Sequence, residues 1–536
     1  MSAARAAARA AAAPALAAAS GLALLASHPP LEWWALSFLA PALLLAALWL
    51  ETAAAAEQAR RPRAFLLGVL AGASTFGPLL SWLLLPAGVI GWGLLVGVQA
   101  VWMGVLAALL RPALYWRSLP LVAALLWTGV DAWRGIWPLN GFGWGAIAYA
   151  HVDGSWLLPT ARLLGGRGIT FLVVLIGAAA AVAIRMTITA LQHREAGDLE
   201  HDLDRRTRVP LSFLVVGLLA SVLLTVEPPA EVGALEVLAV QGNDVRHWEI
   251  EERERDRPLR ITTALHEETL AAIERDGPPD LTVWPESSID RDPFADRGAP
   301  LAELAGDAAA ASGRLLTGAS LDGPDPPTQR LIAALLLDGG FDEVDRYVKR
   351  RLVPFGEFIP LRPLLTWFPP LEQIPRDAQP AAEPQSMEVV DGIEAAVIIC
   401  FETIFSDVVR SNVLHGEAPA EIVFSLTNDA SFGDSAEPAQ HLAQTRLRAV
   451  ETGRWFVHAA LSGSSAFVAP DGRVEQSTAL FTVDSIRAEV PLVTGLTPYL
   501  VIGDVLGWLT RIAVLLAAAF LIRASLQGRR ARRADG

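Results

Sequence analysis

The sequence predicts a chain with two kinds of structure: a membrane block of several α-helical spans and an α/β domain outside the membrane. Hydrophobic residues make up 52% of the 536 residues, and the mean hydropathy is +0.38, values that indicate membrane spans. Apolar runs fall in two blocks, roughly 12–226 and 499–522, and short apolar runs alternate with amphipathic stretches between them. We therefore expect a membrane block at 1–232, an α/β domain at 233–495, and a final span with a basic tail at 496–536.

The apolar runs predict eight spans, seven before the α/β domain and one after it. They lie near 12–27, 33–50, 64–85, 89–110, 118–133, 168–186, 209–226 and 499–522. The first run follows Arg5 and Arg9 and is rich in small residues, as a cleavable signal peptide is. Because further spans follow at once, we expect this first helix to be retained.

The arginines predict the orientation of these spans. If eight spans cross the membrane, the following arginines all lie on one side: Arg5, Arg9, Arg60, Arg61, Arg63, Arg111, Arg117, Arg185, Arg194, Arg205, Arg206, Arg208, Arg529, Arg530, Arg532 and Arg533. The positive-inside rule then predicts a multi-pass protein of the cell membrane, with both termini cytoplasmic and the α/β domain extracytoplasmic. Arg134, Arg162 and Arg167 fall on the other side and do not fit this count.

From residue 233 the pattern predicts an α/β domain, and its roughly 260 residues are ample for one full core. Buried strands are expected at Leu235–Val240, Leu281–Trp284, Leu315–Ala319, Ala395–Ile399 and Ile422–Leu426. Helices are expected at Leu259–Ile273, Leu301–Ala311, Ile404–Leu414 and His441–Val450.

Composition and missing motifs exclude several classes of function. The net charge is −14 with a pI near 5.2 and no basic stripe, so nucleic acid is not an expected partner. A single cysteine cannot form an intramolecular disulfide. The sequence has no P-loop, no Gly-x-Ser-x-Gly elbow and no His-Glu-x-x-His or Cys-x-x-Cys motif, and its nine histidines are scattered. We expect neither a metal site nor a cofactor.

The chain contains one lysine, Lys349, and one cysteine, Cys400. The other basic residues are all arginine, which cannot replace a compact ammonium that shares its proton. Codon bias would also remove lysine, and a lone cysteine is often a small buried hydrophobic residue. The positions of both, together with nearby glutamates, favour a functional role.

Polar residues follow the predicted strands, where open α/β sheets place their sites. Glu286 follows Val283–Trp284, Cys400 follows Ala395–Ile399, and Asp429 follows Ile422–Leu426. A thiol with a free pKa of about 8.5 becomes nucleophilic as the thiolate, which a helix N-terminus and a nearby ammonium both favour. A glutamate can move the thiol proton and a lysine can stabilise an oxyanion, so Glu, Lys and Cys form a consistent set for acyl transfer.

These motifs resemble the carbon–nitrogen hydrolase (nitrilase) superfamily and, more closely, the apolipoprotein N-acyltransferase family. The most specific matches are Lys349–Pro360, Cys400–Glu402 and Asn428–Ser435. Further support comes from Val240–Asn243, Trp284–Glu286, Arg134–Gly135 and Gly141–Trp144. The resemblance implies a four-layer α-β-β-α sandwich for the α/β domain.

The resemblance also implies a role for each matching residue. Glu286 would be the general base, Lys349 the stabiliser of the tetrahedral intermediate and Cys400 the nucleophile, with Glu357 and Glu402 as supporting carboxylates. Trp248 and Phe401 match positions linked to substrate binding. Two residues depart from the family pattern: Phe401 stands where tyrosine is common, and Ser431 where tryptophan is common.

The implied reaction transfers an acyl chain from a membrane phospholipid, through a cysteine thioester, to the α-amine of a lipoprotein's S-diacylglyceryl-cysteine, the last step of lipoprotein maturation. Both partners are held in the lipid bilayer. The apolar loop Ile359–Pro375 contains Trp367 and Phe368 among several prolines, so neither a helix nor a central strand is expected there. It suits an interfacial lipid entrance, although the same residues would also cover the domain's own core.

Two other functions are consistent with parts of the sequence. A membrane-tethered C–N hydrolase (amidase) acting on small substrates would use the same triad, but it would need neither eight spans nor the apolar loop. A transporter or receptor with an inactive outer domain would usually carry ionisable residues inside its spans. Here only Asp131 and Asp504 lie near span ends.

Overall fold

The computed structural model describes residues 2–57, 63–193, 199–244, 257–364 and 374–534, and these divide into two compact units. The first unit is 1–226 together with 504–536, and the second is 227–503. Each unit is described by itself below.

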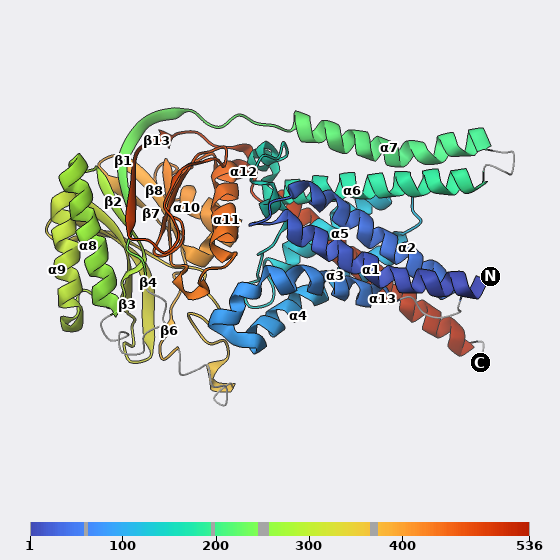
Figure 1. Cartoon of the computed structure of the whole chain (residues 1–536), viewed down its shortest axis with the longest axis horizontal. Helices are drawn as coiled ribbons and strands as arrows, with labels where there is room; N and C mark the ends of the chain where they lie inside the picture. Colours follow the sequence, from blue (N-terminus) through green and yellow to red (C-terminus); the bar gives the residue numbers. More distant parts are fainter. Residues whose placement is uncertain (1, 58–62, 194–198, 245–256, 365–373, 535–536) are drawn as a thin grey trace. The chain divides into compact units, whose positions relative to one another are not determined.

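The first unit is built of apolar α-helices, which Figure 1 labels along the chain. They are α1 (Ser2–Ser27), α2 (Leu39–Glu57), α3 (Ala64–Leu79), α4 (Leu84–Leu110), α5 (Leu119–Arg134), α6 (Ala161–His193), α7 (Leu199–Leu223) and α13 (Val505–Ala534). Each of the eight predicted spans overlaps one of them. Four segments are long and apolar enough to cross a membrane by themselves: Trp34–Ala56, Ser81–Ala113, Leu158–Thr189 and Val505–Gln527. Shorter apolar helices lie at Ala11–Ser27, Ala64–Leu79 and Val209–Leu223.

Predicted span boundaries differ from the helix ends by five residues or more at the end of α3 and at the starts of α4 and α13. The run expected at 64–85 ends as a helix at Leu79, and α4 begins at Leu84 rather than at 89. The last span begins at Val505 rather than at 499, because a separate short helix, α12 (Pro498–Ile502), ends at Gly503. Gly503 has a left-handed φ of 69°, a conformation that glycine adopts at little cost and that ends a helix.

The arginines that do not fit the orientation count have partners inside the first unit. Arg134 is 4% exposed and donates to the Asp131 carboxylate at 2.7 Å and to the carbonyl oxygen of Trp144 at 2.7 Å. Arg167 donates to the Asp504 carboxylate at 2.7 Å.

The second unit is a four-layer α-β-β-α sandwich, as the resemblance implied (Figure 1). One sheet has the strand order β13-β1-β2-β3-β4-β5, with β6 paired to β4, and the other has the order β12-β11-β10-β9-β8-β7. The strands of the first sheet are β1 (Glu231–Gln241), β2 (Leu281–Ile289), β3 (Arg314–Asp322), β4 (Gln329–Asp338), β5 (Glu343–Val348), β6 (Asp377–Ala378) and β13 (Asp484–Val493). Those of the second are β7 (Ser386–Val390), β8 (Ile393–Ile399), β9 (Ile422–Thr427), β10 (Trp455–Ala460), β11 (Ala466–Val468) and β12 (Val474–Ser477).

Three apolar cores separate the four layers. The central core lies between the two sheets and joins residues such as Val237 and Leu336 to Val397 and Phe424. Helices α8 (Arg257–Asp276) and α9 (Ala299–Ser312) pack on the outer face of the first sheet. Helices α10 (Ser406–Val413) and α11 (Glu437–Thr452) cover the outer face of the second.

All five predicted strands and all four predicted helices of this unit are present. The strands β4 to β7 and β10 to β13 were not predicted. Strand β4, with the sequence Gln-Arg-Leu-Ile-Ala-Ala-Leu-Leu-Leu-Asp, is apolar on both faces, and such a run has no period that separates a strand from a buried helix.

Candidate active site

The lone cysteine lies where β8 ends. Cys400 begins a short 3-10 helix, Cys400–Ile404, and its own φ is 50°, in the left-handed region. A non-glycine residue held in this conformation costs on the order of 1–3 kcal/mol, so the surrounding contacts must hold it there. The predicted helix start is therefore a single tight turn, and α10 begins only at Ser406.

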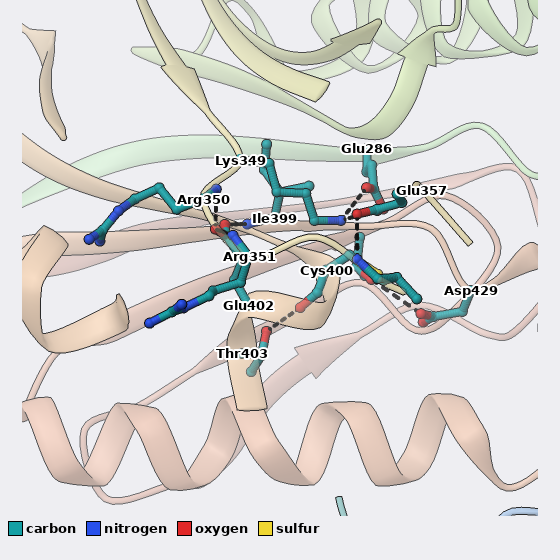
Figure 2. A network of polar contacts seen from close by, with 12 residues as sticks. Glu286, Lys349, Arg350, Arg351, Glu357, Ile399, Cys400, Glu402, Thr403 and Asp429 are labelled. Atoms are coloured by element: carbon teal, nitrogen blue, oxygen red, sulfur yellow. Dashed lines mark hydrogen bonds and ion pairs between the residues drawn. The ribbon is translucent and has the colours of Figure 1, made fainter. Parts of the chain in front are cut away.

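The lone lysine is fully buried between two carboxylates. Lys349 directly follows β5 and has 0% exposure. Its Nζ donates to Oε1 of Glu286 at 3.1 Å and to Oε1 of Glu357 at 2.5 Å. Figure 2 shows the Lys349 side chain extended toward both acids. The other oxygen of Glu357 accepts the Val353 amide at 2.8 Å, so Glu357 also holds the loop after the lysine.

Glu286 lies in an irregular part of β2 rather than beyond the strand end, where the sequence had placed it. The register of β2 against β3 shifts between Trp284 and Ile289. Ser287 within this bulge has a φ of 62°. Gly318 of β3 permits the bulge, because a Cβ there would lie 2.5 Å from the Pro285 carbonyl oxygen.

Burial and charge set the protonation of this cluster. Burial raises the pKa of Glu286, and the Lys349 ammonium opposes that rise. Burial by itself would lower the pKa of Lys349, but the Glu286 and Glu357 carboxylates outweigh it and raise that pKa. The lysine therefore stays an ammonium.

The helix start and the ammonium that were expected to favour the thiolate do not outweigh burial at Cys400. Burial raises the pKa of the Cys400 thiol well above its ordinary value, and the Glu286 carboxylate raises it further. Lys349 lowers this pKa but does not reverse the shift, because its charge is already shared with two acids. Cys400 is therefore a neutral thiol at rest, and a base must take its proton during attack.

Glu402 connects the lysine segment to the cysteine turn. It is 0% exposed, and Oε1 accepts the backbone amides of Arg350 at 2.7 Å and Arg351 at 3.0 Å. Oε2 accepts the Tyr347 hydroxyl and the Ile399 amide, each at 2.8 Å. Figure 2 shows Glu402 beside Arg350, Arg351 and Ile399. Its four bonds hold the residues next to Lys349 and Cys400 in register.

Of the four residues predicted to contact substrate, the structure describes one, Phe401. Phe401 is 8% exposed and packs edge-on against Phe405, with ring centroids 5.1 Å apart. Trp248, Trp367 and Phe368 lie outside the described residues. In the described part of the apolar loop, residues 362–364 form a short 3-10 helix, and Leu361 and Leu364 are 70% and 69% exposed.

Sequence reasoning did not single out Tyr347 or His441, and it noted Asp429 only as a polar residue after a predicted strand. Tyr347 bonds Glu402, and Asp429 and His441 form a buried pair close to Cys400. Donor atoms of Asp429, Glu437 and His441 lie within 4.8 Å of one another, a spacing that could also hold a metal ion. Asp429 was noted from its place after Ile422–Leu426, but no local sequence pattern predicts that His441 of α11 reaches Cys400.

Together the residues supply a thiol, a carboxylate that can accept its proton, and an ammonium for a developing negative charge. This is the set of groups that acyl transfer through a covalent intermediate needs.

Comparisons with known proteins match both units. Residues 20–179 match the family described as the apolipoprotein N-acyltransferase N-terminal domain, and residues 259–495 match the carbon–nitrogen hydrolase family. A nitrilase-superfamily amidase from Nesterenkonia covers 49% of this chain and 93% of its own, with 17% identity and a TM-score of 0.35.

Curated relatives match most of the length of this chain. An apolipoprotein N-acyltransferase of Geobacter metallireducens is 29% identical over 94% of this chain and 95% of its own. One of Bradyrhizobium diazoefficiens is 30% identical over 75% of this chain and 73% of its own. The chain belongs to the apolipoprotein N-acyltransferase family.

Proposed function

We propose that this membrane protein is an acyltransferase that moves a fatty acyl group from a phospholipid to the N-terminal diacylglyceryl-cysteine of lipoproteins. The observation that carries the proposal is the position of Lys349 Nζ, which Glu286 and Glu357 hold beside the partly buried Cys400. The named relatives and the apolar first unit support a lipid-borne substrate.

In the first half-reaction, Cys400 attacks the ester carbonyl of the phospholipid. Glu286 takes the thiol proton as the S–C bond forms, and Lys349 stabilises the oxyanion. The C–O bond to the glycerol then breaks, and Glu286 returns the proton to the departing lysophospholipid. The acyl group remains on Cys400 as a thioester.

In the second half-reaction, the α-amine of the lipoprotein attacks the thioester. Glu286 takes the amine proton, Lys349 again stabilises the oxyanion, and the C–S bond breaks. The proton passes to the cysteine sulfur, so the enzyme returns to the neutral thiol that its raised pKa favours. No redox step or cofactor is needed in either half.

The proposal is tested by incubating the protein with acyl-labelled phospholipid. Neutral hydroxylamine should release the label from the wild-type protein, and Cys400→Ala should carry none. Cys400→Ser should lose most turnover, because a serine hydroxyl is far less acidic than a thiol. Label that persists in Cys400→Ala contradicts the proposal.

A second assay separates the transferase from an amidase or hydrolase. A synthetic diacylglyceryl-cysteine peptide is added after the label has bound, and the products are weighed by mass spectrometry. A transferase yields the N-acyl peptide. Free fatty acid with unmodified peptide would mean that water is the acceptor.

We further propose that the eight helices cross the cell membrane, with cytoplasmic termini and an extracytoplasmic second unit. The arginine-bearing connections support this, because they alternate along the helices. The exposed Leu361 and Leu364 support a lipid entrance at loop 359–375. Reporter fusions at the C-terminus and within the second unit test the orientation, and periplasmic activity at the C-terminus would contradict it.

A further inference from the structure

One buried amide contacts both chain segments that supply the reacting groups. Asn412, in α10, has 0% exposure. Its Nδ2 donates at 2.9 Å to the carbonyl oxygen of Val397, a residue of β8 that lies shortly before the proposed nucleophile. Its Oδ1 accepts from Nη1 of Arg350 at 2.9 Å, and Arg350 directly follows the buried lysine. A single side chain of a third element therefore joins the cysteine strand to the lysine segment.

The amide of Asn412 has only one favourable orientation. A guanidinium donates and never accepts, so the atom that faces Arg350 must be the oxygen. A backbone carbonyl only accepts, so the atom that faces Val397 must be the nitrogen. A flipped amide would place two oxygens together at Val397 and two donors together at Arg350. Both neighbours fix the same choice, and the second hydrogen of Nδ2 is left for another acceptor.

The hydroxyl oxygen of Tyr347 takes that second hydrogen. Burial and the Glu402 charge raise the pKa of Tyr347, and its hydrogen bond with the Asn412 side chain opposes the rise. A bond opposes the rise only if it favours the phenolate, as a donor does, so Asn412 donates to the phenol oxygen. The one hydrogen of the hydroxyl then points to Oε2 of Glu402, 2.8 Å away.

We propose that Asn412 is a positioning residue for acyl transfer, which fixes the direction of the Tyr347 hydroxyl and so holds the ammonium at its working distance from the thiol. The proposal rests on the function proposed above, in which Cys400 is the nucleophile. The hydrogen bonds of Asn412 go to residues that flank Lys349 and Cys400, so it acts through them.

The effect on the rate follows from where the Tyr347 hydroxyl lies. Without the amide, the phenol oxygen loses the donor that fixes it. The hydroxyl can then rotate, and its bond to Glu402, which follows β8 of the other sheet, weakens. Lys349 and Cys400 are each two residues from an end of this bond, so a shift there changes their separation. A misplacement of about 1 Å caused by a change away from the chemistry can cost on the order of 100-fold in rate.

The proposal is tested with Asn412→Asp and Asn412→Ala in the full-length protein. At neutral pH aspartate, paired with Arg350, has the shape of asparagine but no side-chain donor. It would set an oxygen against the Val397 carbonyl and would compete with Glu402 for the hydroxyl hydrogen. Both variants should slow single-turnover acylation at saturating labelled phospholipid roughly 10- to 100-fold, with little change in the lipid concentration that gives half the maximal rate. A role in filling space alone predicts that Asn412→Asp reacts normally.

Ser411→Ala is the matched control. Ser411 lies next to Asn412 in α10 and accepts from the same Nη1 of Arg350, at 2.8 Å. This variant should acylate at the wild-type rate. Arg350→Met is a milder second variant if the buried substitutions do not fold, because it removes the donor that orients the amide from a partly exposed residue. It should slow acylation about tenfold. Melting temperatures are measured for all variants, and rates are compared well below them.

The rate of Cys400 alkylation by iodoacetamide gives a readout that needs no lipid. Burial and the Glu286 carboxylate raise the pKa of the Cys400 thiol and Lys349 lowers it, so a displaced ammonium should slow alkylation in Asn412→Asp as well. Wild-type rates of acylation and alkylation in folded Asn412→Asp, or equal losses in Ser411→Ala, would overturn the proposal. Slowed alkylation in Asn412→Asp, in a protein whose wild type takes no acyl group from lipid, would contradict the proposed function and leave the positioning role standing.

Discussion

The hydroxyl of Tyr347 donates a 2.8 Å hydrogen bond to Oε2 of Glu402 in the buried interior of the second unit. Tyr347 is in β5 of one sheet, two residues before the lysine, and Glu402 follows β8 of the other sheet, two residues after the cysteine. Burial and the Glu402 charge raise the pKa of Tyr347 well above its ordinary value, so the hydroxyl remains a donor. This bond helps to keep the ammonium and the thiol in register across the sandwich.

Tyr347→Phe should destabilise the protein by about 1.5–3 kcal/mol, the usual contribution of a hydrogen bond to a charged group. The ring still fills its place, so kcat for acyl transfer should fall while KM changes little. Thermal unfolding and steady-state kinetics check this, with Phe424→Leu in the central core as a packing control that removes no side-chain hydrogen bond. An unchanged kcat would show that the sandwich aligns Lys349 and Cys400 without this bond.

Lys349→Arg should be nearly as inactive as Lys349→Ala, although it keeps the positive charge. Lys349 has 0% exposure between two acids, which leaves no room for a wider planar guanidinium. Losing one preorganised donor to an oxyanion costs about 100- to 1,000-fold in rate. The control is Arg346→Lys in β5, the strand just before Lys349; Arg346 is exposed and forms a surface ion pair with Glu343. Turnover near normal in Lys349→Arg would mean that the single lysine reflects composition alone.

The rate of thioester formation should fall as the pH drops, and the fall should be centred above the ordinary glutamate pKa of 4.5. Glu286 must be ionised to take the thiol proton, and burial raises the pKa of this carboxyl. A raised pKa means that the base is lost at a higher pH than in a free side chain. Single-turnover acylation by phospholipid measures this without the amine acceptor, whose own titration would interfere. An acid limb at or below 4.5 would exclude Glu286 as the base.

Glu437→Gln should raise the melting temperature at neutral pH but not at acid pH. Burial raises the pKa of Glu437 well above 4.5. The stability that protonated Glu437 contributes is therefore full below pH 4.5, and it is lost as the pH rises through the raised pKa. The neutral amide does not titrate and avoids this loss. The exposed Glu417 is the control, and Glu417→Gln should show no such pH dependence. A lower melting temperature at neutral pH would show that Glu437 is needed as a carboxylate, as it would be in a metal site.

The sequence by itself determined the features that depend on local pattern. Hydropathy located the eight apolar helices, and the alternation of short runs located five strands and four helices of the second unit. The single Lys349 and Cys400, with glutamates eight and two residues further on, already identified the cluster. These features can be predicted from the sequence because they depend on the spacing of hydrophobic residues and on the chemistry of residues close together in the chain.

Only the tertiary structure decided how these groups behave. The bulge at Glu286 depends on Gly318 of another strand, and the neutral state of the Cys400 thiol depends on burial that no local motif encodes. His441 reaches Cys400 from 41 residues away because α11 packs over the turn after β8. The pKa of a group and the partner of a buried polar atom are set by what surrounds them in space, and in this unit those neighbours come from distant strands and helices.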